Sequence, residues 1–178
     1  MKEKPTKTKA TNTYPVSLPE AKRHLRIDDS WDKDNDFIRN CIWAATQKCE
    51  EYIGKDIALT TNVWKIYDYV GSSLWIEEGN FNSLTSVQQA DASTSITVDH
   101  IEKGYNRVYV ELEESVSVDP LYVNYVTGYS VGEVPALMKQ AILVKIGDLY
   151  DVERQSYSAY KENFAYQKLL DSYKIVLY

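Results

Sequence analysis

The sequence predicts an α+β protein in which a helical layer, built from N-terminal and C-terminal helices, carries a central antiparallel β insertion. Residues 34–54 place apolar side chains at three- and four-residue steps, which is the period of an amphipathic α-helix. From residue 59 the period changes to two, as in a strand, and after Val134-Pro135 the helical period returns. Helical and strand segments are grouped and do not alternate as βαβ units, so we expect no parallel nucleotide-binding sheet.

The same patterns divide the 178-residue chain into five parts. Residues 1–14 are predicted to be a disordered basic arm, because they hold almost no apolar side chains. An N-terminal helical part (15–56), an antiparallel β region (57–133) and a helix that packs on the N-terminal helices (134–154) follow. The last part, 155–178, is either a third packed helix or an arm that finds its partner outside the chain.

Helix boundaries can be predicted from capping residues. Ser17 and Glu20 have the spacing of a capping box, so a short helix should begin there and run to about Leu25. Asp32 or Asp34 is expected to cap the second helix, and Gly54 to end it in the left-handed conformation. The predicted apolar stripe of the second helix is Phe37, Ile38, Cys41, Ile42, Ala45, Cys49, Tyr52 and Ile53, and that of the helix after Pro135 is Leu137, Met138, Ala141, Ile142, Leu149 and Tyr150.

Six segments are predicted to be strands of an antiparallel sheet or small barrel. They are residues 59–70, ending at Gly71-Ser72-Ser73, then 74–77, 86–89, 96–98, 107–113 and 121–128. The fifth has the clearest alternation, with Val108, Val110 and Leu112 expected to face inward.

Composition narrows the function classes. A net charge of −6 argues against a protein whose main task is gripping nucleic acid, and 15 tyrosines with 4 tryptophans favour contact surfaces. We expect no secretory leader and no membrane span, because no apolar run of the required length occurs. Cys41 and Cys49 are expected to be reduced, as suits synthesis in a cytoplasm.

No pattern in the sequence predicts a catalytic, cofactor or metal site. His24 and His100 have no partner at a recognised metal-ligand spacing. The acidic run 28–34 lacks the glycine and the final glutamate of a calcium loop. The adjacent pairs Glu77-Glu78 and Glu113-Glu114 should point to opposite faces of a strand, so neither pair can flank a scissile bond. We therefore predict that the chain is not an enzyme.

Several segments, taken in order, resemble the head-to-tail connector proteins of long-tailed bacteriophages. They are Pro15 to Asp28, an acidic loop, Phe37-Ile38 through Glu50-Glu51-Tyr52-Ile53-Gly54, Leu84 to Val87, Val126 to Tyr129, and Val134 to Leu143. The resemblance spans about residues 15–150, and the last thirty residues match only loosely. It departs around Asn80 to Ser83, where family prolines before the central strand are missing, so the sheet edge there is not predicted.

The resemblance implies a structural virion protein at the head-tail junction, made in the host bacterial cytoplasm. Copies of the chain would assemble as a ring, a dodecamer, beneath the portal protein and would seat the tail or stopper protein. Duplex DNA would pass through the lumen without specific binding. Our hypothesis is that the C-terminal segment reaches the portal or a neighbouring copy through Tyr157, Tyr160, Phe164, Tyr166, Leu169, Leu170 and Tyr173.

Two other functions remain open at this stage. An aromatic-surfaced binding module for carbohydrate or single-stranded nucleic acid would need its stacking rings exposed in one row, with Trp64, Tyr67, Tyr69 and Trp75 as the candidates. A carboxylate enzyme would need two acidic side chains facing each other in a cleft.

Overall fold

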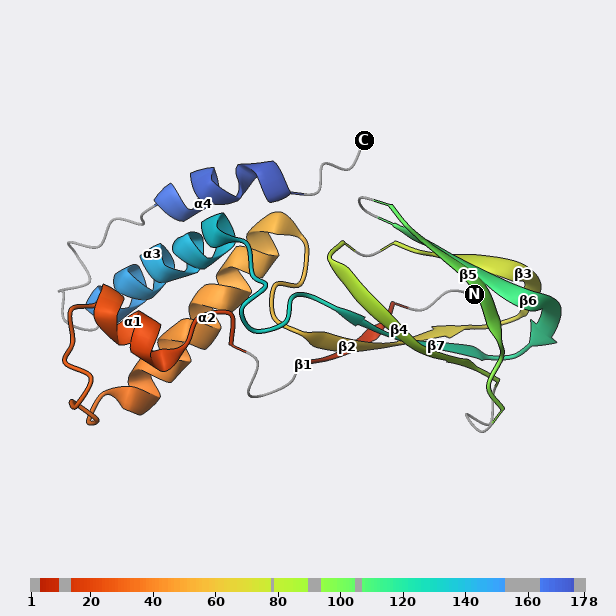
Figure 1. Ribbon diagram of the computed structural model, residues 1–178, viewed down its shortest axis with the longest axis horizontal. Coiled ribbons are helices and arrows are strands. Elements are labelled where there is room, and N and C mark those ends of the chain that lie inside the picture. Colours follow the sequence, from red (N-terminus) through yellow and green to blue (C-terminus); the bar gives the residue numbers. More distant parts are fainter. Residues whose placement is uncertain are drawn as a thin grey trace. The chain divides into compact units, whose positions relative to one another are not determined.

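The computed structural model describes residues 4–9, 14–77, 79–89, 94–104, 107–152 and 164–174, and divides into two compact units (Figure 1). The sheet unit comprises residues 1–10 and 59–128, and the helical unit comprises residues 11–58 and 129–178. The helices are α1 (Leu18–His24), α2 (Asn35–Ile53), α3 (Ala136–Val152) and α4 (Ala165–Leu170), the last followed by a 3-10 turn, Asp171–Tyr173. The strands are β1 (Thr6–Lys9), β2 (Thr60–Ile66), β3 (Tyr69–Ile76), β4 (Phe81–Gln88), β5 (Val98–Lys103), β6 (Val108–Val118) and β7 (Leu121–Thr127). The predicted α+β class is confirmed.

The predicted capping signals act at both N-terminal helices. In the capping box of α1, the Glu20 amide donates to Ser17 Oγ at 3.3 Å and the Ser17 amide donates to Glu20 Oε2 at 2.9 Å. Gly54 ends α2 with a φ of +70°, a left-handed conformation that favours glycine. Asp34 occupies the N-cap position of α2, but its side chain makes no cap hydrogen bond. Its Oδ2 accepts instead from Trp31 Nε1 at 3.1 Å and from the Tyr150 hydroxyl at 2.9 Å.

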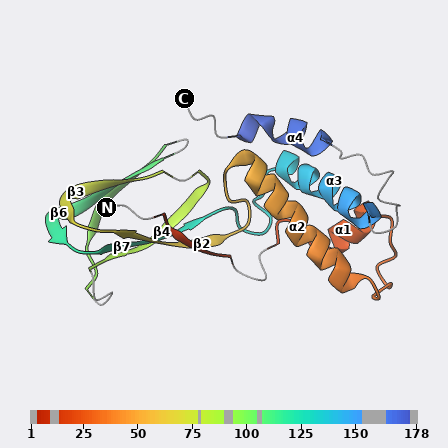
Figure 2. The same ribbon diagram turned by 180° about the vertical axis from the view of Figure 1, so that it is seen from behind.

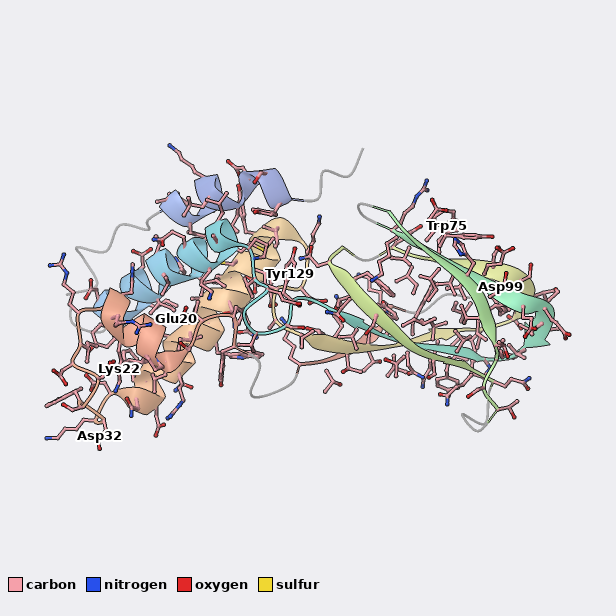
Figure 3. The ribbon with its side chains drawn as sticks, viewed as in Figure 1. Glu20, Lys22, Asp32, Trp75, Asp99 and Tyr129 are labelled. Atoms are coloured by element: carbon pink, nitrogen blue, oxygen red, sulfur yellow. The ribbon has the colours of Figure 1, made fainter. Side chains whose placement is uncertain are left out.

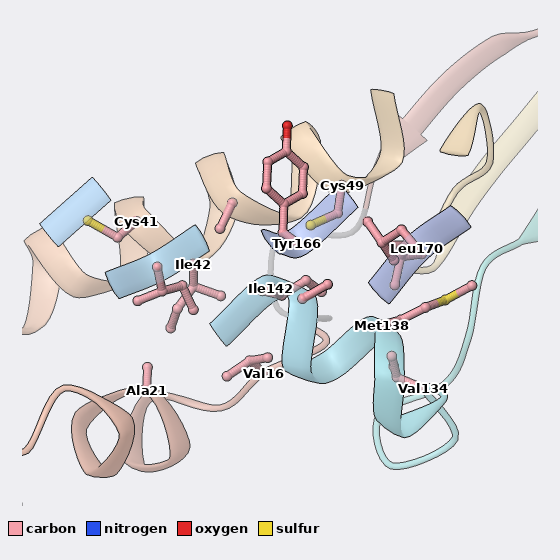
Figure 4. Close-up of a cluster of buried hydrophobic side chains, with 14 of the residues drawn as sticks. Val16, Ala21, Cys41, Ile42, Cys49, Val134, Met138, Ile142, Tyr166 and Leu170 are labelled. Atoms are coloured by element: carbon pink, nitrogen blue, oxygen red, sulfur yellow. The ribbon is translucent and has the colours of Figure 1, made fainter. Parts of the chain in front are cut away.

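The helical unit has its core where α2, α3 and α4 meet (Figure 4). The predicted stripe of α2 supplies Ile38, Cys41, Ile42, Ala45, Cys49 and Ile53, all buried. On α3 the prediction was wrong at Leu137, which is exposed, and it missed Ile146, which is fully buried. Met138, Ala141 and Ile142 define the buried face, and Leu137 lies about 100° around the helix from Met138.

The sheet unit contains two antiparallel sheets, a four-stranded one of order β1-β2-β7-β4 and a three-stranded one of order β3-β6-β5 (Figure 2). Its core combines side chains from both sheets: Trp64, Ile66, Val87, Leu121, Val123 and Tyr125 from the first, and Leu74, Ile76, Val108, Val110 and Leu112 from the second. The inward-facing positions predicted for β6 are therefore confirmed. The arrangement is a two-sheet sandwich in place of the single sheet or barrel predicted.

One predicted strand is in fact two strands, β2 and β3, which belong to different sheets. The chain turns at Tyr67 and Asp68, so residues 59–70 do not form a single strand. Asp68 has a φ of +53°, and Asp tolerates this left-handed conformation better than most residues. Gly71 and Ser73, predicted to end the strand, lie inside β3 at an irregularity in its register with β6.

Residues 6–9 correct the prediction of a disordered arm at 1–14. They form β1, which pairs antiparallel with β2 from Thr6 opposite Val63 to Lys9 opposite Thr60. Pairing at a sheet edge is made by backbone groups and needs no apolar side chain, and Thr has a high strand propensity. A hydrophobicity pattern therefore cannot reveal such a strand.

Candidate assembly surfaces

The part of the chain that the structure describes holds no group of three or more His, Cys, Asp or Glu side chains placed to bind a metal ion. None of its helices combines the length and the apolar character needed to cross a bilayer.

The Glu113-Glu114 pair of β6 lies at an irregularity of the three-stranded sheet. Both residues border one open hollow of about 190 Å³, together with Gln89 and Ser95. The register of β6 against β3 places Val116 opposite Gly71 but Glu111 opposite Ser73, so the residues of β6 between them form a bulge. No further acidic residue lines this hollow among the described residues.

The C-terminal segment is packed on its own chain by aromatic and charged contacts. The Tyr166 ring meets Tyr52 edge-on at 6.0 Å between centroids, and Lys145 Nζ lies 5.1 Å from the Tyr166 centroid. The Tyr52 hydroxyl donates to the Asp171 carboxylate, which raises the pKa of Tyr52, and Lys174 Nζ lies 4.6 Å above the same ring. Of the two alternatives for this segment, the structure shows the packed helix in residues 165–170.

This packing changes the set of candidate interface residues. Tyr166 and Leu170, 4% and 0% exposed, belong to the core of their own unit and are not available to another chain. Their four-residue separation is the spacing of a buried helix face, which was the available signal. Phe164 is 54% exposed, while Leu169 and Tyr173 are partly buried against the core. Tyr157 and Tyr160 lie outside the described residues.

The acidic loop between α1 and α2 is held by a buried lysine that the sequence did not single out. Lys22 of α1 donates from Nζ to the carbonyl oxygens of Asp29, at 3.1 Å, and Trp31, at 2.6 Å. Asp28 Oδ1 accepts from the hydroxyl and the amide of Ser30, which lowers the pKa of Asp28. Figure 3 marks Lys22 on α1 and Asp32 in the loop. The loop presents the exposed Trp31 indole beside a shallow hollow.

An aromatic cluster lies on the sheet unit, where Trp75 of β3 packs against Tyr109 of β6 with ring centroids 4.9 Å apart (Figure 3). The Arg107 guanidinium carbon lies 4.4 Å from the Trp75 ring. Trp75 is 42% exposed, but Trp64 is 8% exposed and belongs to the sandwich core. The four rings proposed for an aromatic binding module thus do not form one exposed row, and that alternative is not supported.

Comparison with known proteins gives the class of this chain. The profile of the phage gp6-like head-tail connector proteins matches residues 15–125, which is more than half of the chain. The chain belongs to this family of head-tail connectors. No curated protein matches it by sequence.

Three similar solved structures come from gene transfer agent (GTA) particles, and each comparison covers 99% of this chain and 97% of the other. They are the neck of an empty particle computed with C6 symmetry (TM-score 0.78, 14% identity), the neck of a native particle computed with C12 symmetry (0.74, 13%) and the virion of a native particle (0.70, 13%). At these identities the likeness shows a shared fold.

Proposed function

We propose that copies of this connector subunit form a closed ring, a dodecamer, beneath the portal protein of a phage-like particle and join the DNA-filled head to the tail or stopper protein. The family match over residues 15–125 carries this proposal. Further support comes from the fold, which matches a chain in a particle neck computed with C12 symmetry over 99% of this chain. The subunit would be made in the cytoplasm of the host bacterium and would work in the virion without catalysis or cofactor.

The charge of the chain suits a ring through which duplex DNA must pass. A lumen rich in Lys and Arg would neutralise phosphates and hold the DNA by counterion release. With a net charge of −6, this chain would let DNA pass without specific binding.

The proposal is tested by measuring the mass of the purified full-length chain alone and with the portal protein of the same particle. We expect a complex that contains twelve copies of the chain when the portal protein is present. A chain that stays monomeric beside the portal protein would contradict the ring.

We further propose that the C-terminal segment contacts the portal or a neighbouring copy through Phe164, together with Tyr157 and Tyr160 in the preceding stretch. Deleting everything after Arg154 is an ambiguous test, because it removes Tyr166 and Leu170 from the core. Phe164→Ala removes an exposed ring and should leave folding intact while weakening assembly. Lys168→Ala, at an exposed position of α4, is the matched control. Equal assembly of both variants would argue against this contact.

A further inference from the structure

Strand β1 lies at the edge of the four-stranded sheet and pairs with β2 through its backbone. Thr6, Lys7 and Thr8 are exposed and Lys9 is partly buried, so no apolar side chain of β1 enters the sandwich core. The pairing covers four residues and ends beside Pro5, which has no amide hydrogen to extend the ladder. An identical strand from another copy would make the same hydrogen bonds with β2.

The edge that β1 covers differs from the other described edges. β3, β4 and β5 each have a register shift against their neighbour, at Gly71/Ser73, at two points in β4, and at Val98/His100. Such irregularities discourage pairing with another chain. β2 pairs with β7 in unbroken register from Thr60 to Ile66. Without β1 it would present a regular edge of the kind that accepts an added strand.

The connection between β1 and β2 runs through the other unit. The chain leaves the sheet unit after residue 10, forms the first part of the helical unit, and returns at residue 59. No hairpin therefore ties β1 to its own β2. Exchanging β1 between copies would break four residue pairs and form the same four pairs with another chain, so the free-energy cost of the exchange is small. The exchange would also link the two copies.

We propose that β1 is an exchangeable strand, and that in the ring the β1 of each copy pairs with Thr60–Val63 of its neighbour's β2. This inference rests on the ring of the proposed function. Each copy donates one strand to a neighbour and accepts one from the other neighbour, which is a head-to-tail contact. Such contacts form a closed ring when the rotations between successive copies add up to a full turn. The short, lysine-bearing β1 would then leave little edge open for further addition.

Cysteine cross-linking between different chains tests the exchange directly. Thr8 lies opposite Thr61, both are exposed, and opposite residues of antiparallel strands lie within disulfide range. Full-length Thr8→Cys and Thr61→Cys chains with different tags are mixed, assembled with the portal protein and oxidised. We expect a shift from one-chain to two-chain bands that carry both tags. Thr8→Cys with Lys65→Cys is the matched control, because Lys65 lies about 13 Å further along β2.

The outcomes separate this inference from the proposed function. Two-tag bands from rings of the mixed variants support the exchange. The wild-type chain should form no disulfide-linked bands, because Cys41 and Cys49 are buried. The exchange is overturned if rings form but the mixed single variants give no two-tag bands, and a Thr8→Cys/Thr61→Cys double variant forms its disulfide only within one chain. The proposed function would still stand in that case. If no ring forms with the portal protein, the proposed function fails and the exchange with it.

Discussion

Glu20 joins two parts of the helical unit. Its carboxylate completes the capping box of α1 with Ser17 and accepts from Lys139 Nζ of α3 at 3.1 Å. The pKa of Glu20 is lowered to about 2, first by the Ser17 backbone amide and also by the Ser17 hydroxyl and Lys139, with burial acting in the opposite direction. One residue thus links the start of a short helix to a long one.

This pKa predicts how stability depends on pH. Because the pKa of Glu20 is lower in the folded state than its ordinary value of 4.5, its stabilisation is complete above pH 4.5 and is lost as the pH falls toward 2. Wild type should therefore lose more stability than Glu20→Gln between pH 6 and pH 3, as measured by urea unfolding. Glu51→Gln, which removes an exposed carboxylate, is the control. An equal loss in wild type and Glu20→Gln would contradict the prediction.

The tryptophans offer a second test at the scale of single residues. Trp64 is 8% exposed and Trp75 is 42% exposed, so a neutral quencher such as acrylamide should reach Trp75 and not Trp64. Trp75→Phe should reduce the quenchable part of the emission, and Trp64→Phe should reduce the protected part. Equal accessibility of the two indoles would contradict the burial of Trp64 in the sandwich core.

At the scale of elements, α4 is the segment for which the sequence left two alternatives open. Leu170 is fully buried against α2 and α3, so Leu170→Ala should lower the free energy of unfolding by about 2–5 kcal/mol. Lys168→Ala on the same helix should change it by no more than about 0.5 kcal/mol. The midpoint of urea unfolding measures both. A Leu170→Ala variant as stable as wild type would mean that α4 does not dock in solution.

Helix α2 can be tested through its buried thiol. Burial, helped by the charge of Glu50 and opposed by that of Lys145, raises the pKa of Cys49 to about 12. Because the thiolate is the reactive form, Cys49 should resist thiol reagents at neutral pH until the protein unfolds. A Cys41→Ser variant isolates the signal, and the reaction is followed with and without denaturant. Rapid labelling in the folded state would contradict the packing of α2.

The sequence predicted well those elements whose ends are set by local side-chain signals, and missed those that depend on backbone conformation or backbone pairing. The boundaries of α1 and α2 were predicted closely, because Ser17, Glu20 and Gly54 are local signals. The turn at Asp68, where the chain passes from one sheet to the other, and strand β1 were missed. A single residue in the left-handed conformation does not change the hydrophobic pattern around it, and β1 pairs through its backbone. For the interface, Phe164 is exposed and its contact stays a prediction, whereas the four-residue spacing of Tyr166 and Leu170 reflects burial within the chain.

At the scale of the whole molecule, the chain is a structural connector subunit. We expect its helical unit and its sheet unit to contact identical copies and other proteins of a larger particle. Electron microscopy of the particle that contains the chain, with the chain tagged, tests this most directly. We predict a closed ring of density for the chain between head and tail. Density elsewhere in the particle, or a chain absent from the purified particle, would contradict a role at the head-tail junction.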